Sequence, residues 1–249
     1  EMFEDMENYI TKTGRGGIDK VVYFENPYTK KLRQFMAGQY GEVFSRKNMP
    51  QYHIDSVLGK GRYIIDEYVD HHLSHASSTY FTSPYTESAI VCIDAIGEFD
   101  TITIWYAHGS KLEKRWSTTY PHSLGLWYSA MTQRLGLKPQ EDEYILMGMA
   151  AWGKENKELQ QEIRTTFFKD TEDIKFKKNL HRGCLDWDSV VLPDDGSEQW
   201  KFDIAHNVQV VCEEEILKIF NKLPDLVPET TNVCYSGGVA LNCVANSLV

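Results

Sequence analysis

The 249-residue sequence lacks the features that mark membrane, secreted or nucleic-acid-binding proteins. Its longest apolar runs, such as residues 89–93, have the length of a strand, so we expect no membrane-spanning segment and no membrane partner. No basic segment followed by an apolar stretch opens the sequence, so we expect no signal peptide. Basic residues are outnumbered by acidic ones, 26 to 36, and form no dense stripe, which argues against nucleic acid as the main partner.

Cysteine is also scarce, with five residues, an odd number. Four of the five stand in apolar surroundings, a pattern typical of reduced, buried thiols in a cytoplasmic protein. The sequence has no Gly-x-Ser-x-Gly, no Cys-x-x-Cys and no Gly-Lys-Ser/Thr. The sequence therefore gives no support for a triad hydrolase, a dithiol redox protein or a P-loop nucleotide-binding protein.

What the sequence does contain is the pattern of an α/β protein with a sizeable core, since 42% of its residues are hydrophobic and 25% are charged. Tight turns separate three β-branched or aromatic runs, which predict an antiparallel part of a sheet. A strand that enters a glycine turn follows near the end, and helical patterns lie before and between these strands. The predicted strands are 21–24, 88–94, 101–108, 112–118 and 232–235, and the predicted helices are 71–81, 123–135, 143–151 and 203–220, with a helix-permissive segment at 1–12.

Residues 154–200 differ in character from the rest of the chain. They are rich in Lys and Glu and then in Asp and Trp, and they include Pro193-Asp194-Asp195-Gly196. We interpret them as an inserted, largely solvated subregion.

Two histidines give the strongest local signal. His71 and His75 lie four residues apart in Asp70-His71-His72-Leu73-Ser74-His75, so both imidazoles leave the predicted helix on one face and could hold one divalent ion. Zinc peptidases with this spacing need a Glu directly after the first His, where this sequence has His72, so peptidase chemistry is not favoured. The alternative is that both histidines are ordinary surface or core residues of the helix.

Asp94 strengthens the metal hypothesis because it closes the strand 88–94, at an end where α/β sheets place ligand-binding residues. Two histidines and one carboxylate with open coordination positions would suit iron(II), zinc or manganese. The alternative is an Asp that only forms a turn shortly before Gly97.

The second signal is the segment from Tyr235 to Asn242, where paired glycines follow a strand and precede an expected helix. Such a turn exposes backbone N–H groups that can hold a phosphate or a nucleotide, although it can equally be a plain tight turn. A third candidate is His122, which is either a site residue or a surface histidine beside a helix that Ser123 would cap.

Five segments in order resemble the NodU/CmcH-type O-carbamoyltransferase family, whose TsaD-like N-terminal domain belongs to the superfamily of actin, sugar kinases and chaperone ATPases. The resemblance implies a ribonuclease H-like mixed sheet with flanking helices, incomplete in this chain. The segments are Asp70–Ala76, Asp94–Glu98, Pro121–Leu126, residues 142–150 with Asp142-Glu143-Tyr144 and Met147-Gly148-Met149-Ala150, and Ser236–Asn242.

The resemblance also implies a reaction. In such enzymes a YrdC-like domain makes carbamoyladenylate from ATP and carbamoyl phosphate, and the TsaD-like domain passes the carbamoyl group to a hydroxyl of a small acceptor such as a sugar or natural product. The family's metal, iron, would be held by His71, His75 and Asp94. The adenosine end would lie at the glycine turn, at Ser236, Gly237, Gly238, Val239 and Asn242, and the two candidates for the general base are His72 and His122.

This sequence departs from the family pattern at several points. Ala95 stands where members have Gly, and Ile145 where they have Lys. The family's phosphate-loop hairpin would precede Glu1, and a further aspartate and the YrdC-like domain would follow Val249. We therefore expect residues 1–249 to be a partial TsaD-like domain that is inactive alone, and a homodimer is left open. The alternatives are a tRNA threonylcarbamoyl transferase, which the net charge of −10 disfavours, and a catalytically silent nucleotide-binding module.

Overall fold

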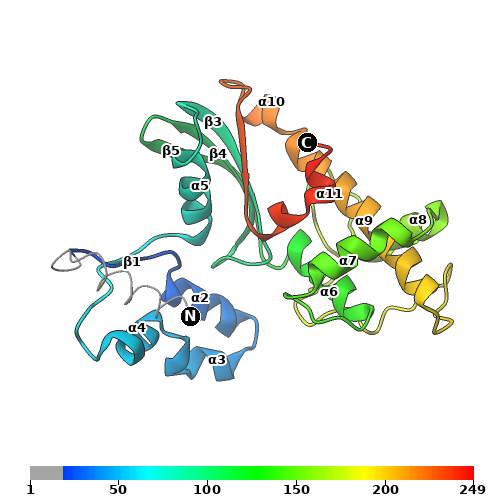
Figure 1. Ribbon diagram of the computed structural model, residues 1–249, viewed down its shortest axis with the longest axis horizontal. Coiled ribbons are helices and arrows are strands. Elements are labelled where there is room, and N and C mark those ends of the chain that lie inside the picture. Colours follow the sequence, from blue (N-terminus) through cyan, green and yellow to red (C-terminus); the bar gives the residue numbers. More distant parts are fainter. Residues whose placement is uncertain (1–18) are drawn as a thin grey trace. The chain divides into compact units, whose positions relative to one another are not determined.

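The structure, a computed structural model, describes residues 19–249, so the helix-permissive segment 1–12 lies outside it. The chain divides into two compact units, which are described separately. The first comprises the chain up to Ser74 together with Gly97–Phe99, and the second comprises His75–Ile96 and Asp100–Val249 (Figure 1). The dividing line falls inside one helix, α5 (His71–Phe81).

The first unit combines a minimal sheet with short helices. Strands β1 (Val22–Tyr23) and β2 (Glu67–Tyr68) pair in parallel, and the predicted strand at 21–24 is thereby confirmed. Asn26 caps the next helix, whose first residue is a proline, a favoured start because Pro lacks the N–H that would stay unpaired there. The helices are α2 (Pro27–Met36), α3 (Tyr40–Phe44), a 3-10 turn (Arg46–Asn48) and α4 (Pro50–Leu58), over a small core of Ile54, Leu58 and Ile65.

A mixed sheet of four strands, in the order β5-β4-β3-β6, forms the centre of the second unit. The strands are β3 (Glu87–Ile93), β4 (Asp100–His108), β5 (Lys111–Thr119) and β6 (Val233–Ser236). The antiparallel pairing of β3 with β4 and of β4 with β5 confirms the predicted meander, while β6 runs parallel to β3. Every residue of β3 after Glu87 is buried, as expected for an inner strand covered on both faces.

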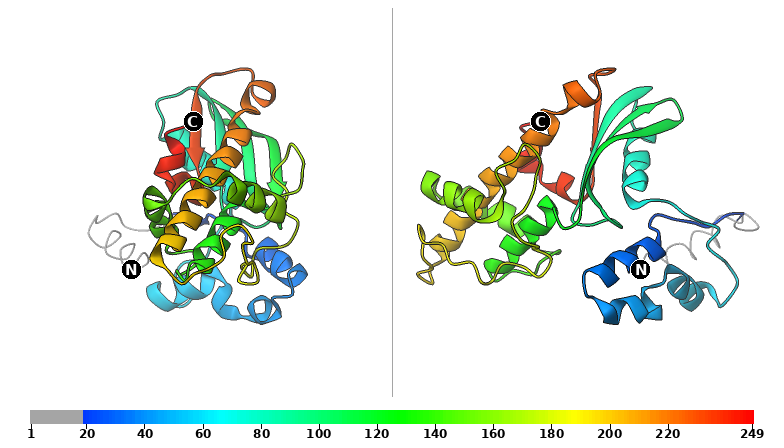
Figure 2. Two further views of the ribbon diagram at one scale, coloured as in Figure 1. Left: turned by 90° about the vertical axis from the view of Figure 1, so that its right-hand side faces the viewer. Right: turned by 180° about the vertical axis from the view of Figure 1, so that it is seen from behind.

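Helices flank this sheet on both sides, with α5 on one face and α9 on the other (Figures 1 and 2). The main core joins one face of β3 and β4 to the helices that follow, and it includes Trp127, Leu146, Ile163, Ile204 and Ile216. These helices are α6 (Leu124–Arg134), α7 (Glu143–Met149) with a 3-10 turn (Ala150–Trp152), α8 (Lys157–Phe167), α9 (Glu198–Phe220), α10 (Leu223–Leu226), a 3-10 turn (Gly238–Leu241) and α11 (Cys243–Asn246). The mixed α/β architecture is as expected and is consistent with an incomplete ribonuclease H-like fold.

Residues 154–200 are exposed at more than half of their positions, in line with the expected solvated subregion, but they also have a buried side that the sequence analysis did not predict. This segment forms α8 and contributes Leu159, Ile163, Phe167, Phe176 and Cys184 to the main core. This buried side is hard to recognise in the sequence because its apolar residues are few. They occur once per helical turn in α8 and singly after it, and charged residues surround them. The predicted insertion itself stays a prediction.

The part of the chain that the structure describes contains neither a transmembrane helix nor a disulfide. Within residues 19–249, no helix combines the length and apolar character needed to span a bilayer. All five cysteines are reduced thiols; Cys92, Cys184, Cys212 and Cys234 are buried, and Cys243 is exposed. Burial raises the pKa of the Cys184 thiol to about 12, so this thiol stays protonated and inert at neutral pH.

Candidate metal centre and glycine turn

Helix α5 begins where the histidine motif begins because Asp70 caps it. The Asp70 carboxylate accepts a hydrogen bond from the N–H of Leu73 at 2.9 Å, the usual arrangement of an N-cap. His71 and His75 therefore lie one turn apart on a single helix, as predicted.

Asp94 follows the last residue of β3, at the edge of the sheet where the parallel strand β6 also ends. Its two carboxylate oxygens face different neighbours. Oδ2 lies 3.4 Å from Nε2 of His75, whereas Oδ1 accepts hydrogen bonds from the N–H of Ala95 at 2.8 Å and from the N–H of Gly238 at 3.3 Å.

Among the described residues, the one group of His, Cys, Asp and Glu side chains close enough to hold a metal ion is that of His71, His75 and Asp94. Their ligand atoms all lie within 4.8 Å of one another, and all three residues are partly buried. Two imidazole nitrogens and one carboxylate oxygen match the donor set of iron(II), zinc and manganese sites with open positions. The residues present thus fit the divalent metal expected from the sequence.

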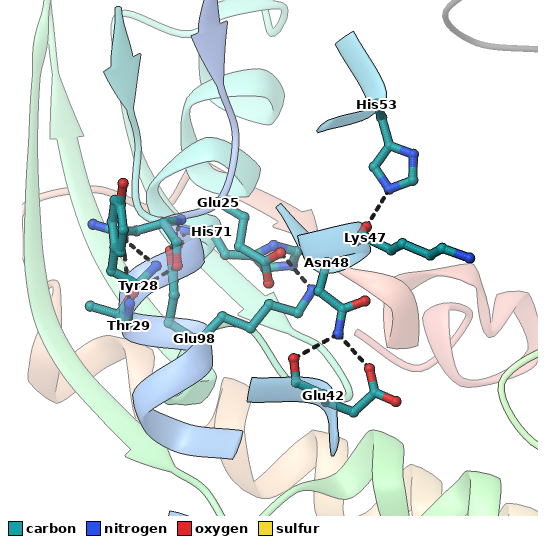
Figure 3. A network of polar contacts seen from close by, with 11 residues as sticks. Glu25, Tyr28, Thr29, Glu42, Lys47, Asn48, His53, His71 and Glu98 are labelled. Carbon is teal, nitrogen blue, oxygen red and sulfur yellow. Dashed lines mark hydrogen bonds and ion pairs between the residues drawn. The ribbon is translucent and has the colours of Figure 1, made fainter. Parts of the chain in front are cut away.

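Glu98 supports the start of α5, a role that the sequence analysis did not assign. Its carboxylate is nearly buried and accepts hydrogen bonds from the N–H of Asn26 at 2.6 Å and from the N–H of His71 at 3.0 Å (Figure 3). The residue before it lies close to both histidines: a Cβ on Gly97 would be 3.0 Å from Cδ2 of His72 and 3.1 Å from Cβ of His71, so a side chain there would require these neighbours to shift. A Gly-Glu pair after a strand is the signal that could have suggested this role.

His72, one candidate for the general base, is fully buried in α5. Its ring lies beside Gly97 and at a tilt to the ring of His71, with 6.0 Å between the centroids. The structure therefore places it next to the metal group, inside the protein.

His122, the other candidate, faces the segment after α8. Its Nδ1 accepts a hydrogen bond from the N–H of Phe176 at 3.2 Å. Burial, assisted by the positive charges of Lys169 and Lys175, lowers the pKa of His122 below its ordinary value. It is not part of the metal group.

Ser123, next to His122, caps α6 as predicted and also touches the Asp94 loop. Its hydroxyl accepts a hydrogen bond from the N–H of Leu126 and donates to the carbonyl oxygen of Ala95 at 2.5 Å. The helix approaches this loop so closely that a Cβ on Gly125 would lie 2.8 Å from Cα of Ala95. The N-terminus of α6 thus holds the loop that carries Asp94.

The glycine turn passes over the end of β3. Gly237 has a φ of +95°, and a Cβ there would lie 2.3 Å from the carbonyl oxygen of Ile93, so only glycine fits. We expected a helix after the turn; the structure instead has a 3-10 turn followed by the four-residue α11. A phosphate held by Ser236, Gly237, Gly238 or Val239 would therefore depend on backbone N–H groups rather than on the dipole of a long helix.

Asn242 lies in a buried polar network that the sequence analysis missed. Its side chain accepts the N–H of Ala245, which caps α11, and exchanges two hydrogen bonds with the amide of Gln209 at 2.9 and 3.1 Å. Gln209 also accepts the hydroxyl of Tyr128 at 2.7 Å and donates to Glu213 at 2.8 Å. The role of Asn242 toward a nucleotide stays a prediction; in the structure this side chain anchors the turn.

Fold and site together define a mixed α/β protein with a candidate metal group and a glycine turn at one edge of its sheet. Residues 5–249 match the sequence model of the carbamoyltransferase N-terminus. The chain belongs to this carbamoyltransferase family, as the sequence motifs indicated.

Relatives of the chain cover most of its length. The uncharacterized protein sll1178 of Synechocystis is 35% identical over 189 residues, which are 71% of this chain and 31% of that protein. The nodulation protein NolNO of Sinorhizobium fredii is 29% identical over 72% of this chain and 26% of its own length. The nodulation protein NolO of Bradyrhizobium diazoefficiens is 26% identical over 72% of this chain and 32% of its own length. The chain thus spans about a third of the length of these curated relatives.

Proposed function

We propose that this chain carries the transfer step of an O-carbamoyltransferase: a carbamoyl group passes from carbamoyladenylate, made from ATP and carbamoyl phosphate, to a hydroxyl of a small molecule such as a sugar or natural product. A divalent metal ion, iron(II) by our expectation, assists the step. The observation that carries the proposal is the convergence of His71, His75 and Asp94, in a chain that belongs to the carbamoyltransferase family.

The proposed role of these three side chains is to hold the metal ion. A bound divalent ion would polarise the carbamoyl carbonyl or neutralise phosphate charge, which favours attack by the acceptor hydroxyl. Two of the three ligands are held by hydrogen bonds: the backbone N–H of His71 donates to the Glu98 carboxylate, and the carboxylate of Asp94 accepts the N–H groups of Ala95 and Gly238. Such fixed ligands lose little freedom on binding.

The glycine turn is the proposed place for the adenylate. Gly237 and Gly238 carry no side chains that would keep a ligand away from the backbone, and Ser236 and Val239 flank them. The turn follows β6 at the edge of the sheet where Asp94 follows β3, so an adenylate bound on the turn would lie beside the proposed metal group.

His122 is better suited to donating a hydrogen bond than to removing a proton. A neutral imidazole has one donor and one acceptor nitrogen, and Nδ1 of His122 already accepts the N–H of Phe176. Its Nε2 therefore carries the proton and could donate a hydrogen bond to an oxygen of the adenylate. His72 stays the candidate for the base, acting next to the metal group.

The experiment is transfer of labelled carbamoyl from carbamoyladenylate to a panel of sugars and natural products, with the full-length protein loaded with iron(II) under anaerobic conditions. The variants are His71→Ala and Asp94→Ala, and the exposed His108→Ala is the matched control. We expect both site variants to lose metal and transfer, and the control to keep both. Retention of metal and transfer in either site variant would contradict the assignment of that ligand.

A further inference from the structure

Gly238 is the residue through which the glycine turn contacts the candidate metal group. Its N–H donates to Oδ1 of Asp94 at 3.3 Å, and Oδ2 of the same carboxylate lies 3.4 Å from Nε2 of His75. One carboxylate thus offers one oxygen to the turn and the other to the histidine.

The space around Gly238 is limited in one direction only. A Cβ on this residue would lie 2.9 Å from Oδ1 of Asp94, closer than real Cβ contacts allow. The only other neighbouring atom within 4 Å among the described residues is Cγ of the same carboxylate, at 4.0 Å. Gly238 also lacks the positive φ of Gly237, so its backbone accepts alanine without strain. Alanine at 238 would therefore fit if, and only if, the Asp94 carboxylate moved.

We infer that Gly238 is a positioning residue for Asp94. Its N–H fixes one carboxylate oxygen, and its missing side chain leaves room for the rotamer that turns the other oxygen toward His75. The glycine at 238 is then needed by a metal ligand, in addition to leaving space for a nucleotide. This inference rests on the proposed function, because it assumes that Asp94 binds a metal ion.

The test is Gly238→Ala, compared with Gly41→Ala as a matched control. Gly41 lies in α3, has no positive φ, and a Cβ there would meet nothing within 4 Å. Mn²⁺ binding to the full-length protein is measured by isothermal titration calorimetry without nucleotide. We expect Gly238→Ala to weaken Mn²⁺ binding about 10-fold, the lower end of the effect of losing a group that orients a metal ligand, and Gly41→Ala to leave it unchanged.

Failure of this inference can be told apart from failure of the proposed function. If the wild-type protein does not bind Mn²⁺ and the alternative ions Fe²⁺ and Zn²⁺ do not bind either, the metal centre itself is refuted. If the wild type binds Mn²⁺ and Gly238→Ala binds it as tightly as Gly41→Ala does, the metal centre stands and the role of Gly238 is refuted.

A second measurement needs no variant, and so it holds even if Gly238→Ala folds poorly. Metal binding should fix the Asp94 carboxylate and with it the hydrogen bond to the N–H of Gly238. Hydrogen exchange of that amide in the wild-type protein, followed by NMR with diamagnetic Zn²⁺, is expected to slow several-fold on metal binding, while the amide of Gly41 is unaffected. Equal exchange at Gly238 with and without bound metal would overturn the inference.

Discussion

Asp94 and Glu98 stand four residues apart in one loop, yet their carboxylates are used in opposite ways. Asp94 gives one oxygen to backbone N–H groups and directs the other at His75. Glu98 gives both oxygens to backbone N–H groups, those of Asn26 and His71. Asp94 therefore directs one oxygen at the candidate metal group, whereas both oxygens of Glu98 hold backbone groups of the protein.

The partner of the second oxygen thus distinguishes a carboxylate that faces the candidate metal group from one that only stabilises the fold. The same distinction separates the other candidate residues. Asn242, like Glu98, makes its side-chain hydrogen bonds within the protein: its amide pairs with that of Gln209 and caps α11. Nδ1 of His122 accepts the N–H of Phe176. The side chains of His71, His75 and Asp94 are the ones that converge on a common point.

Asp94→Asn tests most directly whether Asp94 and Glu98 have different roles, and we expect it to have the largest effect on metal affinity. The amide oxygen can still accept the N–H groups of Ala95 and Gly238, so the fold should be kept, but the negative charge that a divalent ion needs is lost. We expect Mn²⁺ affinity to fall about 100-fold, equivalent to about 2.7 kcal/mol.

Calorimetric titration of the full-length protein measures this change, and the exposed Asp186→Asn is its control. Metal binding by Asp94→Asn within a factor of about 3 of the wild type, or about 0.7 kcal/mol, would show that Asp94 is not a metal ligand.

Glu98→Gln should have the opposite effect to Asp94→Asn: it should reduce the free energy of unfolding more than it reduces metal affinity. A glutamine offers one oxygen and turns its NH₂ group toward the second backbone N–H, so one donor is left unsatisfied. We expect a loss of about 2 kcal/mol in the free energy of unfolding, measured by urea titration, and a smaller decrease in metal affinity through the start of α5. The exposed Glu172→Gln should be unchanged in both; a large loss of metal affinity with full stability in Glu98→Gln would refute the division of roles.

Gln209→Leu tests whether Asn242 is a scaffold residue. Leucine is close to glutamine in size but leaves the Asn242 amide and the Tyr128 hydroxyl without their partner in the core. We expect about 1.5 kcal/mol of destabilisation and a weaker hold on the turn, seen as faster hydrogen exchange around 237–245. Gln209→Leu should reduce metal affinity less than Gly238→Ala does. A larger loss of metal affinity in Gln209→Leu would show that Gln209 helps to hold the metal ligands.

His122→Gln should have the smallest effect and a pH-dependent one. Because the folded pKa of His122 is lowered from its ordinary value of 6.5, the unfolded chain binds more protons at mildly acidic pH. The stabilising effect of the neutral ring is thus fully present above pH 6.5 and is lost as the pH falls toward the folded pKa.

Urea titrations at pH 7.5 and pH 5.5 measure this effect. Glutamine can accept the N–H of Phe176 but does not titrate, so we expect the variant to lose less stability between the two pH values than the wild type. An unchanged difference between the two pH values would show that His122 carries no such linkage; the exposed His108→Gln is the control.

Much of this architecture could be predicted from the sequence because local signals were strong. The apolar run of β3, the turn residues around Gly109 and the capping Ser123 determine the meander and α6 with little help from distant contacts. Likewise, the four-residue spacing of His71 and His75 on a helix suffices to bring them together, and the end of a strand suffices to place Asp94.

Other features could not be predicted, because they depend on contacts between residues far apart in the chain. The amide of Gln209 meets that of Asn242 across 33 positions, and Glu98 reaches Asn26 across 72. The core of residues 154–200 was missed for a related reason, since its apolar side chains meet their partners only after α9 packs against α8. The two polar contacts leave no periodic pattern in the sequence.

The two adjacent glycines of the turn have a consequence for how substitutions would be tolerated. At Gly237 both the positive φ and the approach of Ile93 exclude a side chain, so any replacement should reduce the amount of folded protein in the cell. At Gly238 the one obstacle is the movable carboxylate of Asp94, so alanine should leave abundance intact while impairing the metal group. A saturation library scored for abundance and for activity would then separate neighbouring positions, one constrained by the fold and the next by its chemistry.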